Sequence, residues 1–129
     1  TKPYTIAYKT ISNVENVFLL LTLENGIVGI GAANPDVQVI GESTADVLQN
    51  CESDLCQSFV GRDIKHFRAI INEIAIAFPG KPGTLVAWDI ALHDAFGKYL
   101  GIPVVDFYNR TVKSLPTSVT IGIMDVEHT

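Results

Sequence analysis

The chain has 129 residues, of which 47% are hydrophobic and only 18% are charged, with a formal net charge of −5. This length and apolar content suit one domain with a buried core and exclude wholesale disorder. A net negative charge without a cluster of Lys or Arg argues against a nucleic-acid partner or an anionic membrane surface. The low share of charged residues indicates that part of the surface packs against another domain.

The longest apolar run, Val17–Leu21, is far shorter than the ~20 residues that span a membrane, and no signal peptide precedes it. The two cysteines, Cys51 and Cys56, lie five positions apart in what is predicted to be one helix, where their side chains point in different directions. This spacing favours buried thiols in a reducing compartment over a disulfide, so the cytoplasm is the expected location.

The clearest strand signal is the apolar, partly β-branched run Val17–Leu23, and the segment before it, Pro3–Tyr8, is predicted to be extended chain or loop. Asn25-Gly26 follows the run, and because both residues tolerate positive φ they predict a hairpin turn. The return strand is Ile27–Gly31. A two-stranded hairpin is marginal alone, so other elements must cover one of its faces.

Three amphipathic helices are predicted after the hairpin, because apolar residues recur three or four positions apart. Their expected limits, with capping residues, are Ser43 or Thr44 to Gly61, Asp63 to Pro79, and Thr84 to Gly101. A hairpin followed by helices predicts an α+β fold. After them, Leu115–Ile123 predicts one more strand that leads toward a helix, which is how a β/α unit begins.

Glycines and an acidic residue near the hairpin have a structural explanation. Gly29–Asn34 nearly matches a dinucleotide-binding fingerprint, but a phosphate-binding turn must open a helix, and none is expected before residue 43. Close packing and turns explain these glycines better. Glu42 stands just before an N-cap, where its charge favours the helix dipole.

Asp89, His93 and Asp94 on the third predicted helix raise the question of metal binding or acid–base chemistry. Asp89 and His93 are four positions apart and share a face, as do Asp94 and Lys98. No second histidine stands at the spacing of a metal ligand. A polar face turned to solvent or to another domain is therefore the favoured interpretation.

Lys9 closes an aromatic-flanked segment that is predicted to be a loop. A cation beside Tyr4 and Tyr8 can hold the carboxylate of a substrate. From the residues alone, an ordinary surface lysine remains the stronger explanation.

Five stretches, taken in order, resemble the N-terminal part of enolase-superfamily enzymes of the muconate-lactonizing group, and most closely the L-Ala-D/L-Glu type of dipeptide epimerase. They are Thr1–Tyr4, Asn25–Gly31, Gly41–Ser43, Ala87–Pro103 and Thr117–Ile121. The resemblance implies an α+β capping domain, made of an antiparallel β-meander or hairpin packed on a helical bundle, placed over a (β/α) barrel of the TIM type. Residues 1–113 would form the cap, with its first strand expected before Thr1. Residues 114–129 would begin the barrel, whose remainder is absent.

The resemblance also implies a Mg²⁺-dependent isomerase that removes the proton α to a carboxylate, with an acidic dipeptide or a related carboxylate as substrate. The family's catalytic lysines and metal ligands lie in later barrel strands, so this stretch is expected to hold no catalytic or metal-binding residue and to be catalytically incomplete. Two positions carry over as substrate contacts. Lys9 takes the place of a loop Arg or Lys that binds a side-chain carboxylate, and Thr120 lies on the first barrel strand. Lysine lacks the bidentate geometry of arginine.

Two departures from the family's pattern bear on the substrate. Ala32 stands where the family has Glu, and Phe107–Arg110 stands where it has Leu-Leu-Gly-Gly. Muconate cycloisomerase or o-succinylbenzoate synthase activity therefore stays open beside epimerisation, as does a stand-alone α+β binding module without catalysis. The expected partners are a small-molecule substrate, the protein's own barrel domain and, since the family is often oligomeric, further copies of the protein.

Overall fold

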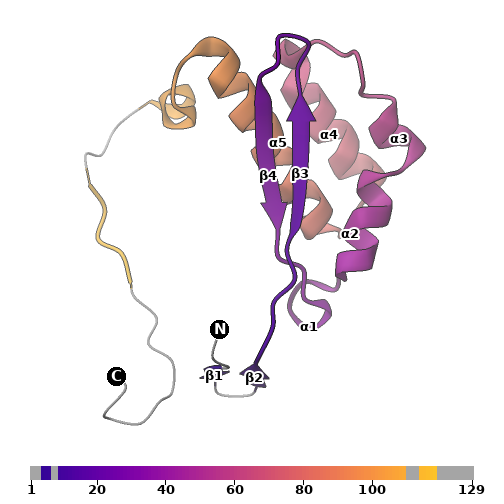
Figure 1. The fold of residues 1–129 in the computed structure, drawn as a ribbon, viewed down its shortest axis with the longest axis vertical. Helices are drawn as coiled ribbons and strands as arrows, with labels where there is room; N and C mark the ends of the chain where they lie inside the picture. The colour runs from indigo at the N-terminus through magenta and orange to yellow at the C-terminus, as the bar shows by residue number, and fades with distance from the viewer. Residues whose placement is uncertain (1–3, 7–8, 110–113, 119–129) are drawn as a thin grey trace. The chain divides into compact units, whose positions relative to one another are not determined.

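The structure is a computed structural model that describes residues 4–6, 9–109 and 114–118. The chain divides into two compact units, one formed by residues 1–14 and 110–129 and the other by residues 15–109 (Figure 1). We call them the first and the second unit and describe each by itself.

The first unit contains a short hairpin where loop or extended chain is predicted. β1 (Tyr4–Ile6) pairs antiparallel with β2 (Lys9–Ile11), and Ile6 lies opposite Lys9. Residues 114–118 have no regular secondary structure. The rest of the predicted strand Leu115–Ile123 lies outside the described residues, so that prediction stays open.

The second unit opens with the predicted main hairpin, which is confirmed. β3 (Val17–Thr22) pairs antiparallel with β4 (Val28–Ala33). The turn between them closes through a hydrogen bond of 2.9 Å from the Gly26 N–H to the Leu23 carbonyl, and Gly26 has a φ of 82°. A type I turn followed by a left-handed glycine is a common three-residue hairpin connection. Asn25-Gly26 therefore marks the turn as predicted, although only Gly26 takes the positive φ that both residues tolerate.

Side chains alternate between the two faces of this hairpin. Leu19, Leu21 and Leu23 pack against the core. The outer face presents large apolar side chains with substantial exposure: Phe18 at 66%, Leu20 at 61%, Val28 at 37% and Ile30 at 46%. Apolar side chains gathered on an exposed face are typical of a surface that another part of a protein covers.

The helical layer differs from the prediction in its boundaries more than in its content. The helices are α1 (Val37–Ile40), α2 (Thr44–Cys51), α3 (Asp54–Gln57), α4 (Phe67–Ala77) and α5 (Pro82–Leu100), with 3₁₀ turns η1 (Ile64–His66) and η2 (Val104–Tyr108). The expectation of no helix before residue 43 is wrong, because the Asp36 side chain caps the single turn α1. The first predicted helix is two helices, since Ser53 caps a new start at α3.

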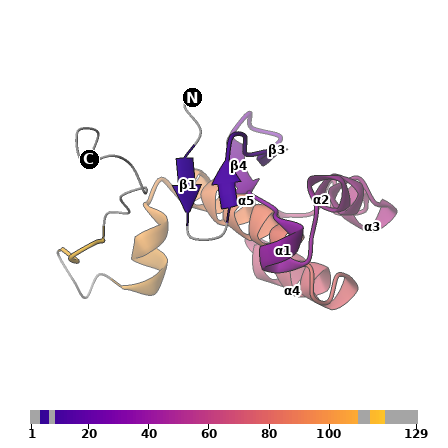
Figure 2. The same ribbon diagram turned by 90° about the horizontal axis from the view of Figure 1, so that it is seen from below.

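The long helix α5 lies between the β3–β4 hairpin and α4 (Figure 2). Gly29 and Gly31 of β4 face it directly. A Cβ on Gly31 would lie 2.8 Å from the Ala91 backbone nitrogen and would overlap the Ala87 carbonyl, and one on Gly29 would lie 2.6 Å from the Ala95 Cβ. The interpretation of these glycines as close-packing residues is therefore confirmed. Small residues on both surfaces let strand and helix backbones approach.

The core of the second unit is built from two clusters of buried side chains. Trp88 of α5 and Ile74 of α4 belong to the larger one, in which the Phe59 ring meets the Trp88 ring edge-on at 5.7 Å. Val17, Ala33, Val47 and Ala87 form the smaller cluster between the hairpin, α2 and α5. Among the described residues, no helix combines the length and apolar character needed to cross a membrane.

Candidate functional site

The two residues predicted to contact substrate lie where the structure does not test them. Lys9 is the first residue of β2, opposite Ile6 of β1, instead of standing in a loop. Its side chain is outside the description. Thr120 lies outside the described residues altogether. Both stay predictions.

A network of hydrogen bonds around the buried carboxylate of Glu42 joins three segments of the second unit. Glu42 is fully buried, and its carboxylate accepts hydrogen bonds from the Gly83 N–H at 2.7 Å and from the Thr84 N–H at 3.2 and 3.3 Å. The Thr84 hydroxyl donates to the same carboxylate, and the Asn50 amide lies 3.4 Å from it. Because Lys81, at the N-cap of α5, provides no capping side chain, Glu42 satisfies the free N–H groups of this helix from a distant point in the chain.

The helix whose N-terminus Glu42 stabilises is not the one expected from the sequence. The helix that follows it, α2, is capped by Ser43 and Asp46 in a reciprocal capping box. Hydrogen bonds from Ser43 lower the pKa of the Asp46 carboxyl. The Glu42 carboxylate binds the first turn of α5 instead, where the helix dipole favours a negative charge. A Cβ on Gly83 would lie 2.8 Å from Glu42 Oε2, so this close approach depends on glycine.

Asp94 and Lys98, which were predicted to pair, form hydrogen bonds with backbone groups at the outer edge of β4. Asp94 accepts a hydrogen bond of 2.8 Å from the Ile30 N–H, and Lys98 donates to the Val28 carbonyl at 2.8 Å. The two side chains also form an ion pair at 2.6 Å. Burial raises the pKa of Asp94, but the hydrogen bonds from Lys98 and Ile30 outweigh it, so the pKa lies below its ordinary value. The pair occupies backbone groups that a neighbouring strand would otherwise take.

Asp89 and His93 share a face as predicted, and a tyrosine joins them. His93 Nδ1 lies 2.9 Å from the Asp89 carbonyl and 3.3 Å from its carboxylate, while Nε2 lies 2.8 Å from the Tyr108 hydroxyl. Sequence reasoning missed Tyr108, because it stands beyond the helix that carries the other two. The pair lines a shallow cavity of about 520 Å³ beside Ile30 and Ile90.

The two cysteines are free thiols, as predicted. Burial raises the pKa of Cys51 to about 11, and it raises that of Cys56 as well. The buried indole N–H of Trp88 has no hydrogen-bond partner among the described residues. It lowers the pKa of both thiols by less than burial raises it. Thiols held in this way are poor nucleophiles, so they carry no catalytic role.

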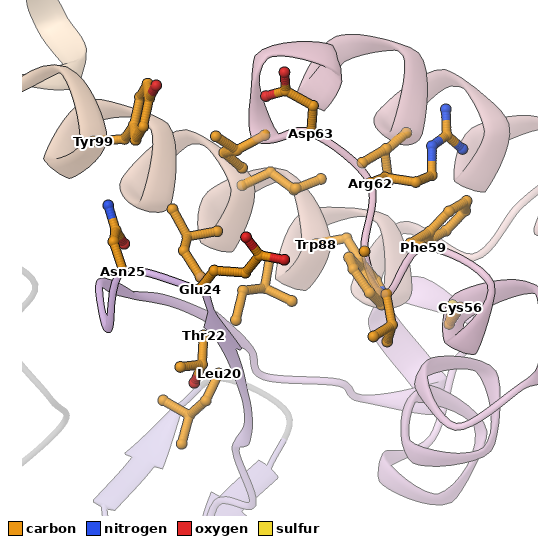
Figure 3. Close-up of a pocket in the computed structure, with 17 residues that line it drawn as sticks. Leu20, Thr22, Glu24, Asn25, Cys56, Phe59, Arg62, Asp63, Trp88 and Tyr99 are labelled. Atoms are coloured by element: carbon orange, nitrogen blue, oxygen red, sulfur yellow. The ribbon is translucent and has the colours of Figure 1, made fainter.

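A larger cavity of about 570 Å³ lies along the edge of β3 that faces away from β4 (Figure 3). Leu20 and Thr22 line one side, and Cys56, Phe59 and Trp88 line the other. Within the described part of the chain no strand pairs with this edge. The Arg62 guanidinium, at the rim, is held by a bidentate pair with Glu73 at 2.8 and 2.9 Å.

Metal ligands do not gather anywhere in the described residues, where no group of three or more His, Cys, Asp or Glu side chains could hold an ion. A magnesium site therefore does not fit these residues. The polar groups that the structure brings together secure helix starts, a strand edge and the last turn of the second unit.

These features define a small α+β domain. Residues 1–108 match the family described as "Mandelate racemase / muconate lactonizing enzyme, N-terminal domain". The chain belongs to this family, and the resemblance inferred from its motifs is confirmed.

The chain is similar to three proteins whose names or solved structures describe epimerases. It is 46% identical over its whole length to an L-Lys-D/L-Arg epimerase of Desulforapulum autotrophicum, and 29% identical over 98% of its length to an L-Ala-D/L-Glu epimerase of Clostridium acetobutylicum. It also superposes, with a TM-score of 0.87 and 37% identity over 98% of its length, on a crystal structure of a Methylococcus capsulatus dipeptide epimerase complexed with Mg and L-Arg-D-Lys. The chain spans 36%, 35% and 36% of these three proteins, respectively.

Proposed function

We propose that the protein to which this stretch belongs is a dipeptide epimerase, with residues 1–113 as its capping domain and residues 114–129 as the start of its catalytic barrel. The observation that carries the proposal is the 46% identity, over the whole chain, to a protein named an L-Lys-D/L-Arg epimerase. Such an enzyme inverts the configuration at an α-carbon, which requires removing and returning the α-proton. The catalytic groups for this step would lie outside the present residues.

We favour a cationic dipeptide as the substrate. The two relatives named for Lys and Arg dipeptides are 46% and 38% identical to the chain, whereas those named for L-Ala-D/L-Glu are 25% to 31% identical. Lys9 supports the second candidate, an acidic dipeptide, because a lysine near the substrate attracts a side-chain carboxylate and repels a cation. With a cationic substrate, Lys9 would instead contact the dipeptide's terminal carboxylate, and Thr120 would remain a substrate contact from the barrel.

Magnesium is supported by relatives, and the residues that the structure describes hold no cluster of ligands for it. Two solved structures of the M. capsulatus dipeptide epimerase contain Mg. Since the described residues hold no cluster of metal ligands, the ion would bind residues that lie elsewhere in the protein. The two reduced and mostly buried cysteines support a cytoplasmic location.

The test is isotope exchange by the full-length protein in D₂O. L-Lys-L-Arg and L-Ala-L-Glu are incubated separately with enzyme and Mg²⁺, and deuterium at the α-carbon is followed by NMR. Exchange that is faster with L-Lys-L-Arg is the expected result. Faster exchange with L-Ala-L-Glu supports the acidic alternative and the expected role of Lys9. Exchange with neither dipeptide, nor with a muconate-type acid, contradicts the enzymatic proposal and leaves the binding module.

A further inference from the structure

We propose that Tyr108 is a nucleophile with His93 as its general base, and that its hydroxyl is a site of acyl transfer from small, uncharged, activated esters. This site is independent of the proposed function, because it involves only side chains of the second unit and a covalent step that needs no dipeptide. Two observations carry it: the hydrogen-bonded series Asp89–His93–Tyr108 and the cavity that it borders.

The hydrogen-bond geometry sets the roles of the two ring nitrogens of His93. Nδ1 faces the carbonyl and the carboxylate of Asp89, at 2.9 and 3.3 Å, and both are acceptors. In the neutral ring Nδ1 must therefore carry the proton. Nε2 is left as the acceptor for the Tyr108 hydroxyl, which lies 2.8 Å away. Asp89 thus holds the imidazole in the tautomer that can take the proton of the phenol.

The base is held in place, whereas the nucleophile is accessible. The His93 side chain is only 13% exposed, and its ring meets the Phe67 ring edge-on at 4.9 Å. Tyr108, in contrast, is 57% exposed. A nucleophile within hydrogen-bond reach of a base, which a third group orients in turn, is the arrangement that activates hydroxyl nucleophiles in enzymes.

The cavity beside the phenol indicates which donors would fit. It has a volume of about 520 Å³, and its apolar wall is formed by Ile30, Ile90 and Val104. This wall suits a short acyl chain. Asp89 and Asp94 also line the cavity, and their negative charges disfavour an anionic donor such as an acyl phosphate. The favoured class is therefore an uncharged ester with a good leaving group.

The acyl transfer needs no group beyond the ester and these side chains. Tyr108 Oη attacks the carbonyl carbon of the ester and forms a new C–O bond, while its proton passes to His93 Nε2. The bond between the acyl carbon and the leaving oxygen breaks, and its electron pair stays with that oxygen. The Asp89 carboxylate, 3.3 Å from Nδ1, stabilises the imidazolium until its proton passes to the leaving group or to water. The product is an O-acyl tyrosine, and no atom changes its oxidation state.

The experiment treats the full-length protein with p-nitrophenyl acetate and locates acetyl groups over time by peptide mass spectrometry. Tyr99 is the internal reference, because it is 40% exposed and its hydroxyl has no hydrogen bond among the described residues. We expect Tyr108 to be acetylated at least about tenfold faster than Tyr99, a part of the ~10²–10⁴ that a positioned general base contributes in enzymes. Hydroxylamine should remove the label from Tyr108, since it cleaves a phenyl ester but not an acetylated lysine.

Two variants test the base and the cavity. His93→Gln keeps a hydrogen-bonding side chain but removes the base, so acetylation of Tyr108 should fall to the rate of Tyr99, whose own rate should not change. p-Nitrophenyl butyrate should label Tyr108 about threefold faster than the acetate, because its longer chain gains apolar contact in the cavity. Ile90→Asn should abolish this preference. Ile76→Asn, the matched control at a 79% exposed isoleucine of α4 that does not line the cavity, should retain it.

Two results would overturn the proposal. Acetylation of Tyr108 no faster than that of Tyr99 in the wild-type protein shows that the hydroxyl is not activated, and this comparison needs no variant to fold. An unchanged Tyr108 rate in His93→Gln shows that exposure alone explains its reactivity. Failure of the protein to turn over any dipeptide would contradict the proposed function and leave these labelling rates untouched, so the two failures are distinguishable.

Discussion

The buried carboxylate of Glu42 offers the most direct test of how this domain is held together. Glu42→Ala would leave the Gly83 and Thr84 N–H groups without their acceptor at the buried start of α5. An unsatisfied buried donor costs about 1–3 kcal/mol. Two such donors, together with the lost contacts of the side chain, predict a loss of about 3–5 kcal/mol. That is a large part of the ~5–15 kcal/mol that stabilises an ordinary domain.

The loss is measured by urea denaturation, followed through the fluorescence of Trp88, the single tryptophan of this chain. Glu52→Ala is the matched control, because it makes the same change at an exposed carboxylate, and it should shift stability by less than ~0.5 kcal/mol. Glu42→Gln should be intermediate: it preserves size but turns an NH₂ group toward donors. If Glu42→Ala costs no more than Glu52→Ala, the account of α5 being capped by Glu42 is wrong.

Three further predictions concern the hairpin and the thiols. Gly31→Ala should cost about 2 kcal/mol or more in the same urea assay, because its Cβ would push the sheet away from α5; a neutral effect would contradict the close approach. The pKa of Asp94 is lowered in the folded state, so its contribution to stability is present above the unfolded value of ~3.9 and is lost as pH falls below it. Asp94→Asn should therefore weaken the protein at pH 7 and flatten the acid limb of its stability curve, and an unchanged acid limb would refute this. Cys51 should react with a maleimide at pH 8 about 100-fold more slowly in the native state than in urea, given its pKa of about 11. Cys56, whose pKa is also raised by burial, should be slowed as well, and equal rates in the two states would show that the thiols are accessible.

Local signals in the sequence predicted the local structure well. Asn25-Gly26 marks a turn, Ser43 caps α2, and Gly101 ends α5 in the left-handed conformation, because each acts on backbone groups a few residues away. The break inside the first predicted helix had a readable signal in Ser53, whose side chain caps the Cys56 N–H. The apolar periodicity runs across this break and hides it.

Long-range pairs could not be predicted in the same way. Nothing near Glu42 indicates that its acceptors will meet the N–H groups of Gly83 and Thr84, which lie 41 and 42 positions later. The same holds for the hydrogen bond between His93 and Tyr108, since a helical pattern ends between them. The motif resemblance supplied the fold because it carries the packed arrangement along with the residues. It left the roles of these side chains to the structure.

The two outer edges of the β3–β4 hairpin differ in whether their backbone groups have hydrogen-bond partners. In the antiparallel register, residues 18, 20 and 22 of β3 and residues 28, 30 and 32 of β4 turn their backbone groups outward. At β4, Asp94 and Lys98 occupy the Ile30 N–H and the Val28 carbonyl. At β3, the outward groups border the larger cavity, and no strand of the described residues pairs with them. A further strand that joined this hairpin would therefore pair with β3 and not with β4.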